Sequence, residues 1–141
     1  MILVALMLSG IVGKAQKIEI MEVKVSNWSQ PNMPDGIDGI KNGGVWNANQ
    51  AAPASIEFYF TKTSDVQKFH YTCIGNRFGD WRFSLYGLSN GKWTKIKDFN
   101  FTTTQMDQSY TSKFYAENIS GIKFEVTQSQ GWVSFKNLWL E

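Results

Sequence analysis

The stretch SIEFYF, residues 55–60, alternates apolar side chains with others without interruption. Ile56, Phe58 and Phe60 therefore fall on one face of an extended chain, because successive side chains of a β-strand point to opposite faces. The stretch GIKFEVTQS, residues 121–129, repeats this pattern. Both stretches are predicted to be strands that bury one face, and together they indicate an all-β domain.

Further segments with a period of two surround these strands. The apolar residues of segments 69–73 and 81–85 share one phase within each segment, and segment 132–140 changes phase midway. Segment 18–25 changes phase at Met21, where a β-bulge would return the later apolar side chains to the inner face. Turn clusters rich in Gly, Asn, Pro and Asp separate these segments, at residues 30–44, 75–80, 89–91 and 128–131. Since no segment of about 11 residues keeps a helical period, we predict an antiparallel jelly-roll β-sandwich.

The composition limits the class of protein. The chain has 141 residues, which is enough for one domain with its own core. Aromatic residues make up 15% of the chain and charged residues 18%, which favours a folded over a disordered chain. The formal net charge is +2, and no basic stripe of the kind that binds nucleic acid is present in the sequence. We therefore expect a monomeric domain that does not bind nucleic acid.

Residues 1–15 have the character of a secretory signal peptide. Residues 2–12 are almost all apolar, and Gly13 and Ala15 form a small-residue cleavage motif. The apolar run is shorter than the roughly 20 residues that cross a bilayer. A positively charged segment before the run is missing, so an apolar N-terminal strand or a misplaced start codon is the alternative. We predict a mature domain at residues 16–141 that is secreted, periplasmic or displayed at the cell surface.

Three motifs occur in an order that carries a family resemblance. The first is Ile37-Asp38-Gly39 followed by Trp46, the second is SNGKWT at residues 89–94, and the third is the pair of segments 119–126 and 132–140. Together they resemble the coagulation-factor type C (F5/8 type C), or discoidin, family over residues 17–141. Bacterial members of that family are carbohydrate-binding modules with a galactose-binding-domain-like jelly roll, and the resemblance implies the same fold and ligand class here.

The same resemblance implies one structural calcium ion. Members that bind calcium use the Asp of the Asp-Gly pair, a Thr in the following loop and a Glu in the last strand. Asp38 matches the first of these positions, whereas the Thr position falls on Gly43 or Gly44 and the Glu position on Asn137. Calcium prefers several carboxylate ligands, so the expected site, with Asp38 and Asn137 as its ligands, is a weakened one unless Asp35 or Glu141 compensates.

One turn supplies the side chains that a sugar site requires. The segment NRFGDW, residues 76–81, contains the bidentate donor Arg77, the aromatic Phe78 and the acceptor Asp80. The resemblance places the sugar-binding Arg of the family near Arg77, in a turn that is shorter here. The alternative for Arg77 is an ordinary surface arginine. Trp81 shares its phase with apolar neighbours and is predicted to lie in the core.

Two more tryptophans lie in polar surroundings. Trp28 sits in a polar segment and Trp132 follows a glycine, so periodicity does not place either of them in the core. Exposed tryptophans in loops favour binding, although each could instead cover the end of the core. Trp46 carries the family motif and is expected to be structural, and the neighbouring Asn47 is a further ligand contact.

Catalysis is not expected. A glycosidase needs two carboxylates about 5 to 10 Å apart across one sugar. The only acids in the candidate loops are Asp35, Asp38 and Asp80, and the first two are better explained by turn formation. The only histidine, His70, and the only cysteine, Cys73, have no further ligands or partners to make a zinc site or a nucleophile pair. A lone cysteine also cannot form an internal disulfide.

The predicted function is thus a non-catalytic carbohydrate-binding module that recognises a terminal sugar or short glycan through loops at one end of the sandwich. The alternative is an adhesion domain that binds a protein partner or, less in keeping with the sequence, a lipid headgroup. Membrane insertion is not expected, because the loop at residues 40–45, which carries hydrophobic spikes in membrane-binding relatives, contains a lysine.

Overall fold

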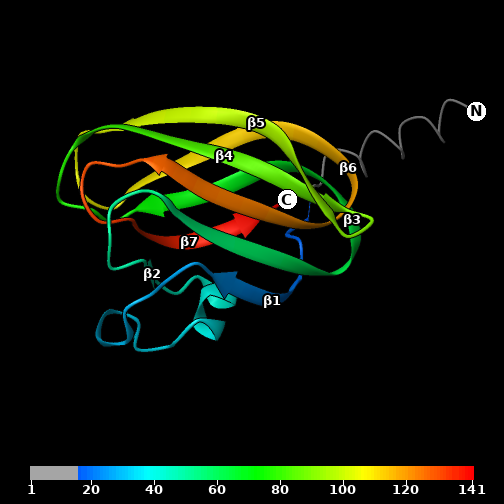
Figure 1. Ribbon diagram of the computed structural model, residues 1–141, viewed down its shortest axis with the longest axis horizontal. Coiled ribbons are helices and arrows are strands. Elements are labelled where there is room, and N and C mark those ends of the chain that lie inside the picture. The colour runs from blue at the N-terminus through cyan, green and yellow to red at the C-terminus, as the bar shows by residue number, and fades with distance from the viewer. Residues whose placement is uncertain (1–15) are drawn as a thin grey trace, which may run out of the picture.

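The computed structural model describes residues 16–141, and the predicted signal peptide at residues 1–15 lies outside them. The all-β prediction is confirmed: the regular structure is seven strands and two short 3₁₀ helices (Figure 1). The strands are β1 (Ile20–Val25), β2 (Trp46–Asn47), β3 (Ala54–Cys73), β4 (Gly79–Ser89), β5 (Lys92–Thr103), β6 (Gln108–Gln128) and β7 (Ser134–Leu140), and the helices are η1 (Gln30–Asn32) and η2 (Asp38–Asn42). Among these residues no helix has the length and apolar character needed to cross a membrane.

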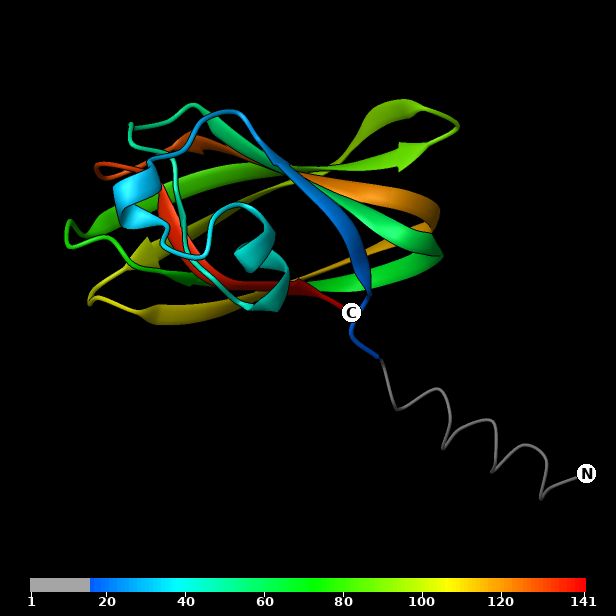
Figure 2. The ribbon, with the colours of Figure 1, turned by 90° about the horizontal axis from the view of Figure 1, so that it is seen from below.

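Two long strands join the layers of the sandwich. All strand pairs are antiparallel, in the order β2-β7-β3-β6-β4-β5, with β1 paired to β3. Residues 54–59 of β3 pair with residues 121–126 of β6, and residues 68–73 of β3 pair with residues 108–113 of β6. The first part of β3 also pairs with β1, and the second part with β7. Hence β3 and β6 pass from one layer to the other, and the register shifts between Tyr59 and Lys68 mark the crossing (Figures 1 and 2).

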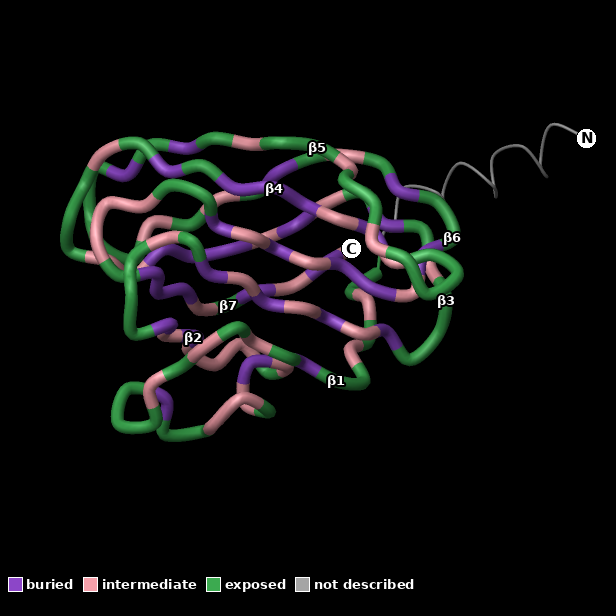
Figure 3. The backbone as a smooth tube through the Cα atoms, in the orientation of Figure 1, coloured by how far each residue is buried: buried purple, intermediate pink, exposed green. Residues whose placement is uncertain are grey.

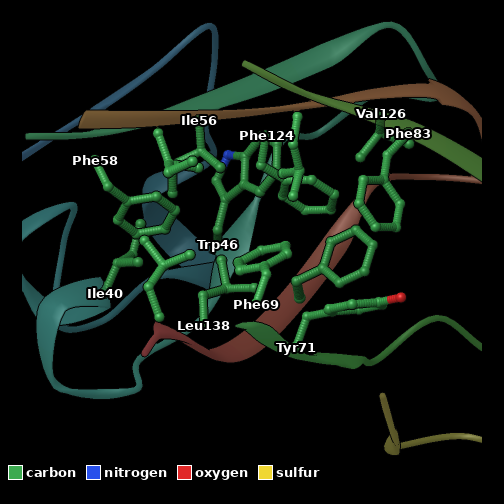
Figure 4. Packing of buried hydrophobic residues seen from close by; sticks show 14 of the residues in the cluster. Ile40, Trp46, Ile56, Phe58, Phe69, Tyr71, Phe83, Phe124, Val126 and Leu138 are labelled. Carbon is green, nitrogen blue, oxygen red and sulfur yellow. The ribbon is translucent and has the colours of Figure 1, made fainter. Parts of the chain in front are cut away.

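Aromatic rings fill the space between the layers. The ring centroid of Phe124 on β6 lies 4.9 Å from Phe69, 4.8 Å from Phe83 and 5.2 Å from Phe135. Trp46 from β2 is fully buried beside them, which agrees with its expected structural role (Figure 4). Buried and more exposed positions alternate along the strands, as their period of two requires (Figure 3).

Both predicted changes of phase are present. The β1–β3 register shifts between Ile20 and Glu22, and the bulge at Met21 leaves that side chain 58% exposed. On β7, Asn137 has a φ of +50° where the pairing with β3 shifts. The irregularity at Asn137 allows the apolar residues on both sides of it to point inward. Trp81 is also fully buried, as predicted.

Candidate functional site

Two loops meet at one end of the sandwich, at the left of Figure 1. The loop from β3 to β4 and the loop from β6 to β7 are joined where the Ile74 N–H donates to the Ser134 carbonyl at 3.1 Å. Between them lies a hollow of about 360 Å³. Its lining brings together the predicted contacts Arg77 and Trp132, with Ile74, Gly75, Asn76, Gln130, Gly131 and Ser134.

Hydrogen bonds hold the loop that carries Trp132. Ser129 Oγ donates to the Gly131 carbonyl at 2.7 Å and accepts from the Ala52 N–H at 2.9 Å. The Val133 N–H donates to the Gln50 carbonyl at 2.8 Å. These bonds fix the loop on both sides of Trp132, which reduces the ordering that a ligand would have to impose.

Arg77 lies across Gly131. A Cβ at Gly131 would come within 3.2 Å of Arg77 Cδ, and Gly131 has a φ of +125°. Glycine thus provides both the backbone conformation and the space for the arginine stem. In the described part of the chain no acidic side chain pairs with the Arg77 guanidinium. Its donors are free to bind a ligand.

The two exposed aromatics of these loops differ in position. Trp132 is 56% exposed and lines the hollow. Phe78, which follows Arg77, is 47% exposed but is not part of the lining. Trp132 is therefore the aromatic surface available inside the hollow, and Phe78 lies outside it.

Asp80 is held outside the hollow. Its carboxylate accepts a hydrogen bond from Thr102 Oγ1 on β5 at 2.7 Å. Its backbone carbonyl accepts from Gln130 Nε2 at 2.9 Å. Asp80 thus orders the side chain of Gln130, which lines the hollow, while one oxygen of its own carboxylate bonds to the neighbouring strand.

Trp28 and Asn47 lie beside the hollow. Asn47 pairs with Ser134, one of the lining residues, in the β2–β7 ladder. The Ser29 N–H donates to the Asn47 carbonyl at 3.1 Å, which places Trp28 next to this strand, 37% exposed. Asn47 Oδ1 accepts from the Asn49 N–H at 2.8 Å, so its amide nitrogen is the group left for a ligand. Neither residue is part of the lining of the hollow itself.

Asp38 and Asn137, the predicted calcium ligands, approach the same loop. Asp38 begins η2, Gly43 follows its last residue as the C-cap, and the Asn137 N–H donates to the Gly43 carbonyl at 3.2 Å. The Asp38 side chain is 89% exposed and pairs with Lys41 Nζ at 3.6 Å. Residues 16–141 contain no group of three His, Cys, Asp or Glu side chains that could hold a metal ion. Calcium prefers several carboxylate ligands, and here the one carboxylate at this position is paired with a lysine. A bound calcium ion remains a prediction from the sequence.

Sequence reasoning did not single out Gln130, and it included Asn76 only as a neighbour of Arg77 in the turn at residues 76–81. Both line the hollow beside Arg77 and Trp132. Only their positions in the sequence point to a role in binding, because Gln130 belongs to the turn cluster before Trp132 and Asn76 directly precedes Arg77.

No family model matches this chain. No curated protein matches it either.

Solved structures do resemble it. A family 32 carbohydrate-binding module from Clostridium perfringens, in complex with GalNAc-β-1,3-galactose, has a TM-score of 0.71 and 20% identity, over 89% of this chain and 99% of that one. An F5/8 type C domain from Bacteroides fragilis has a TM-score of 0.65 and 13% identity, over 84% and 89%. A truncated AlyQ with family 32 module and alginate lyase domains has a TM-score of 0.66 and 17% identity, over 89% of this chain but only 32% of that one.

These likenesses establish the fold. The chain has the galactose-binding-like jelly roll of family 32 carbohydrate-binding modules and F5/8 type C domains, as the motifs predicted. This chain spans about a third of the length of the AlyQ structure.

Proposed function

We propose that this domain is a non-catalytic carbohydrate-binding module that holds a terminal sugar or short glycan in the hollow between Arg77 and Trp132. The observation that carries the proposal is that two hydrogen-bonded loops bring Arg77 and Trp132 to one hollow. Arg77 has no acidic partner among residues 16–141, and the indole of Trp132 is exposed. A neighbour of the same fold is itself in complex with a GalNAc-galactose disaccharide.

The chemistry of the lining suits a pyranose. The indole of Trp132 offers a flat apolar surface for the C–H face of a sugar ring. The Arg77 guanidinium can donate to two adjacent hydroxyls, and the amides of Asn76 and Gln130 can both donate and accept. A site of this kind discriminates between epimers, because a misplaced hydroxyl leaves its polar groups unpaired.

The absence of acids in the lining supports a binding role. No Asp or Glu is among the described residues that line the hollow. Asp80, the nearest candidate by sequence, has its carboxylate bonded to Thr102. Glycoside hydrolysis by two carboxylates about 5 to 10 Å apart would need acids from outside this lining.

The test is a glycan array followed by titration of the best hit. A shallow site that contacts one or two sugars should bind with a Kd of about 0.1 to 1 mM. Arg77→Ala and Trp132→Ala should each abolish detectable binding, and Trp28→Ala should weaken it if the ligand extends toward Asn47. Arg82→Ala is the matched control, since Arg82 is an exposed arginine on β4 outside the hollow.

Two outcomes would count against the proposal. Hits that persist unchanged in both Arg77→Ala and Trp132→Ala would place the sugar elsewhere on the domain. Folded protein that binds no glycan on the array would favour the alternative of a protein partner, and a lipid headgroup can be tested in the same way with liposomes.

A further inference from the structure

One layer of the sandwich contains β7, residues 68–73 of β3 and residues 108–113 of β6. The face of this layer that points away from the core has an ordered pattern of side chains. Where β6, β3 and β7 lie side by side, their outward residues form cross-strand rows given by the strand pairing. The middle row is Thr111, His70 and Trp139, and the row on one side is Ser109, Thr72 and Lys136. On the other side Lys113 and Lys68 are paired, and Glu141 lies next to Lys68. None of these residues lines the hollow between Arg77 and Trp132, which we call the loop-end hollow.

Trp139 and His70 form a flat platform in the middle row. Their rings are stacked, with centroids 3.8 Å apart and an interplanar angle of 11°. His70 thus covers one face of the indole. Trp139 is only partly buried, and no other described aromatic ring stacks on it, so its remaining surface can accept a planar apolar partner.

The platform is locked in position. His70 Nε2 donates to Glu141 Oε1 at 2.9 Å, and Nδ1 accepts from Thr111 Oγ1 at 2.8 Å, which engages both ring nitrogens. Lys68 Nζ lies 3.3 Å from the same Glu141 oxygen. The hydrogen bond with His70, aided by Lys68, holds the pKa of the Glu141 carboxyl below its ordinary value. A surface whose side chains are already ordered loses less entropy on binding.

A hollow of about 510 Å³ adjoins the platform. Hydroxyl and amide groups from several elements line it beside Trp139. They include Thr72, Ser109, Thr111, Asn42 and Asn137. Thr72 and Ser109 bond to each other, and Thr111 bonds to His70, so the side-chain amides of Asn42 and Asn137 are the groups left for a ligand. An apolar ring bordered by polar groups is the combination that a sugar requires.

The charge of this face selects among sugars. Lys17 lines the hollow, and the strand pairing puts Lys68, Lys113 and Lys136 on the same face, against the two acids Glu141 and Asp107. Lys68 and Lys136 are paired with those acids. In residues 16–141 no acidic side chain pairs with Lys17 or Lys113. Two positive charges are therefore left for an anionic ligand.

We propose that this face is a second sugar-binding surface, separate from the loop-end hollow, which takes an acidic oligosaccharide with one pyranose ring on Trp139 and carboxylates near Lys17 and Lys113. It shares only its ligand class with the proposed function and is argued from its own residues. A domain with both surfaces would hold a chain of uronic acids along β3 and β7.

The experiment measures binding of an oligogalacturonate, with a neutral galactose oligomer of the same length as the comparison. It is done in the Arg77→Ala, Trp132→Ala double variant, so that failure of the loop-end site and failure of this surface are separated. The oligogalacturonate should bind the double variant, shift the indole N–H resonance of Trp139 and bind more weakly as salt is raised. The Trp139→Phe spectrum identifies that resonance, and Phe should retain part of the affinity.

Further substitutions complete the test. Adding Trp139→Ala should weaken binding about tenfold, which corresponds to about 1.4 kcal/mol, and adding Lys113→Gln should weaken it about two- to fivefold. Lys62→Gln, at an exposed lysine in β3 away from this face, is the control and should have no effect. No binding of the oligogalacturonate to the double variant would overturn the proposal. Equal binding of the neutral oligomer, or binding unchanged by Trp139→Ala, would also overturn it.

Discussion

The stem of Arg77 and the backbone of Gly131 occupy adjoining space, with 3.2 Å between Arg77 Cδ and the position that a Cβ on residue 131 would take. The two residues come from different loops, so the position of the guanidinium over the hollow depends on the absence of a side chain at residue 131.

Gly131→Ala should therefore weaken sugar binding as well as stability. The added methyl group displaces Arg77, and a φ of +125° is unfavourable for alanine, so the free energy of unfolding should fall by about 1 kcal/mol or more. Gly91→Ala is the matched control, since Gly91 has a φ of +74° but nothing within 4 Å. It should lose stability and keep full affinity. Titration with the best array hit and thermal melts of both variants decide this, and unchanged affinity in Gly131→Ala would contradict the assigned role of Arg77.

Phe124 should be among the most sensitive positions of the core. It is fully buried and packs against aromatic rings from both layers. Phe124→Ala leaves a cavity between the layers and should reduce the free energy of unfolding by about 3 to 5 kcal/mol. Tyr115→Ala, at a position 63% exposed on the same strand, should change it by less than about 0.5 kcal/mol. Urea denaturation measures both values, and similar losses in the two variants would refute the packing argument.

Strand prediction succeeded where one face of a strand is buried, and it failed where neither face is. The SIEFYF stretch was found from its alternation, but β3 continues through residues 61–65, which are polar and mostly exposed. Backbone pairing with β6 holds this part of β3 extended, with an irregular register, and such pairing leaves no side-chain signal.

The candidate site was predicted in its parts and not in its assembly. Arg77 and Trp132 were chosen for their chemistry in separate loops, and the bond from Ile74 to Ser134 that joins those loops has no local sequence signal. Asp80 was chosen in the same way, yet its carboxylate bonds to Thr102 because β4 and β5 pair at that position. The stacking of His70 on Trp139 likewise depends on the β3–β7 register.

Alkaline pH should destabilise the domain. Burial raises the pKa of the Cys73 thiol from 9.0 to about 11 and that of the Tyr71 phenol from 10.0 to about 12. The unfolded chain loses these protons first, so the stability that they contribute is complete below pH 9 and is lost progressively as the pH rises toward 12.

Urea midpoints at a series of pH values test this. Cys73→Ala should remove the part of the decline that begins near pH 9, while the part due to Tyr71 remains. A midpoint that is constant from pH 8 to about pH 11 would show that the unfolded and folded states titrate alike.

A calcium ion at Asp38 would raise the thermal stability of the domain, because a ligand that binds only the folded state stabilises it. If the ion is bound, chelator should lower the melting temperature, added calcium should restore it, and Asp38→Asn should abolish the response. Asp35→Asn tests whether the neighbouring acid compensates. A melting temperature that does not respond to chelator or to calcium at any concentration would show that no calcium ion stabilises this fold.

Because β3 and β6 each belong to both layers, neither layer can separate from the other without breaking its own central strands. Amide protons in the middle of both layers should therefore exchange with solvent through one global opening, at the same free energy, whereas protons of the short β2 exchange through local fraying. A sugar bound at the loop end would then slow exchange of the amides in the middle of both layers, including those far from the ligand, without any change in structure there.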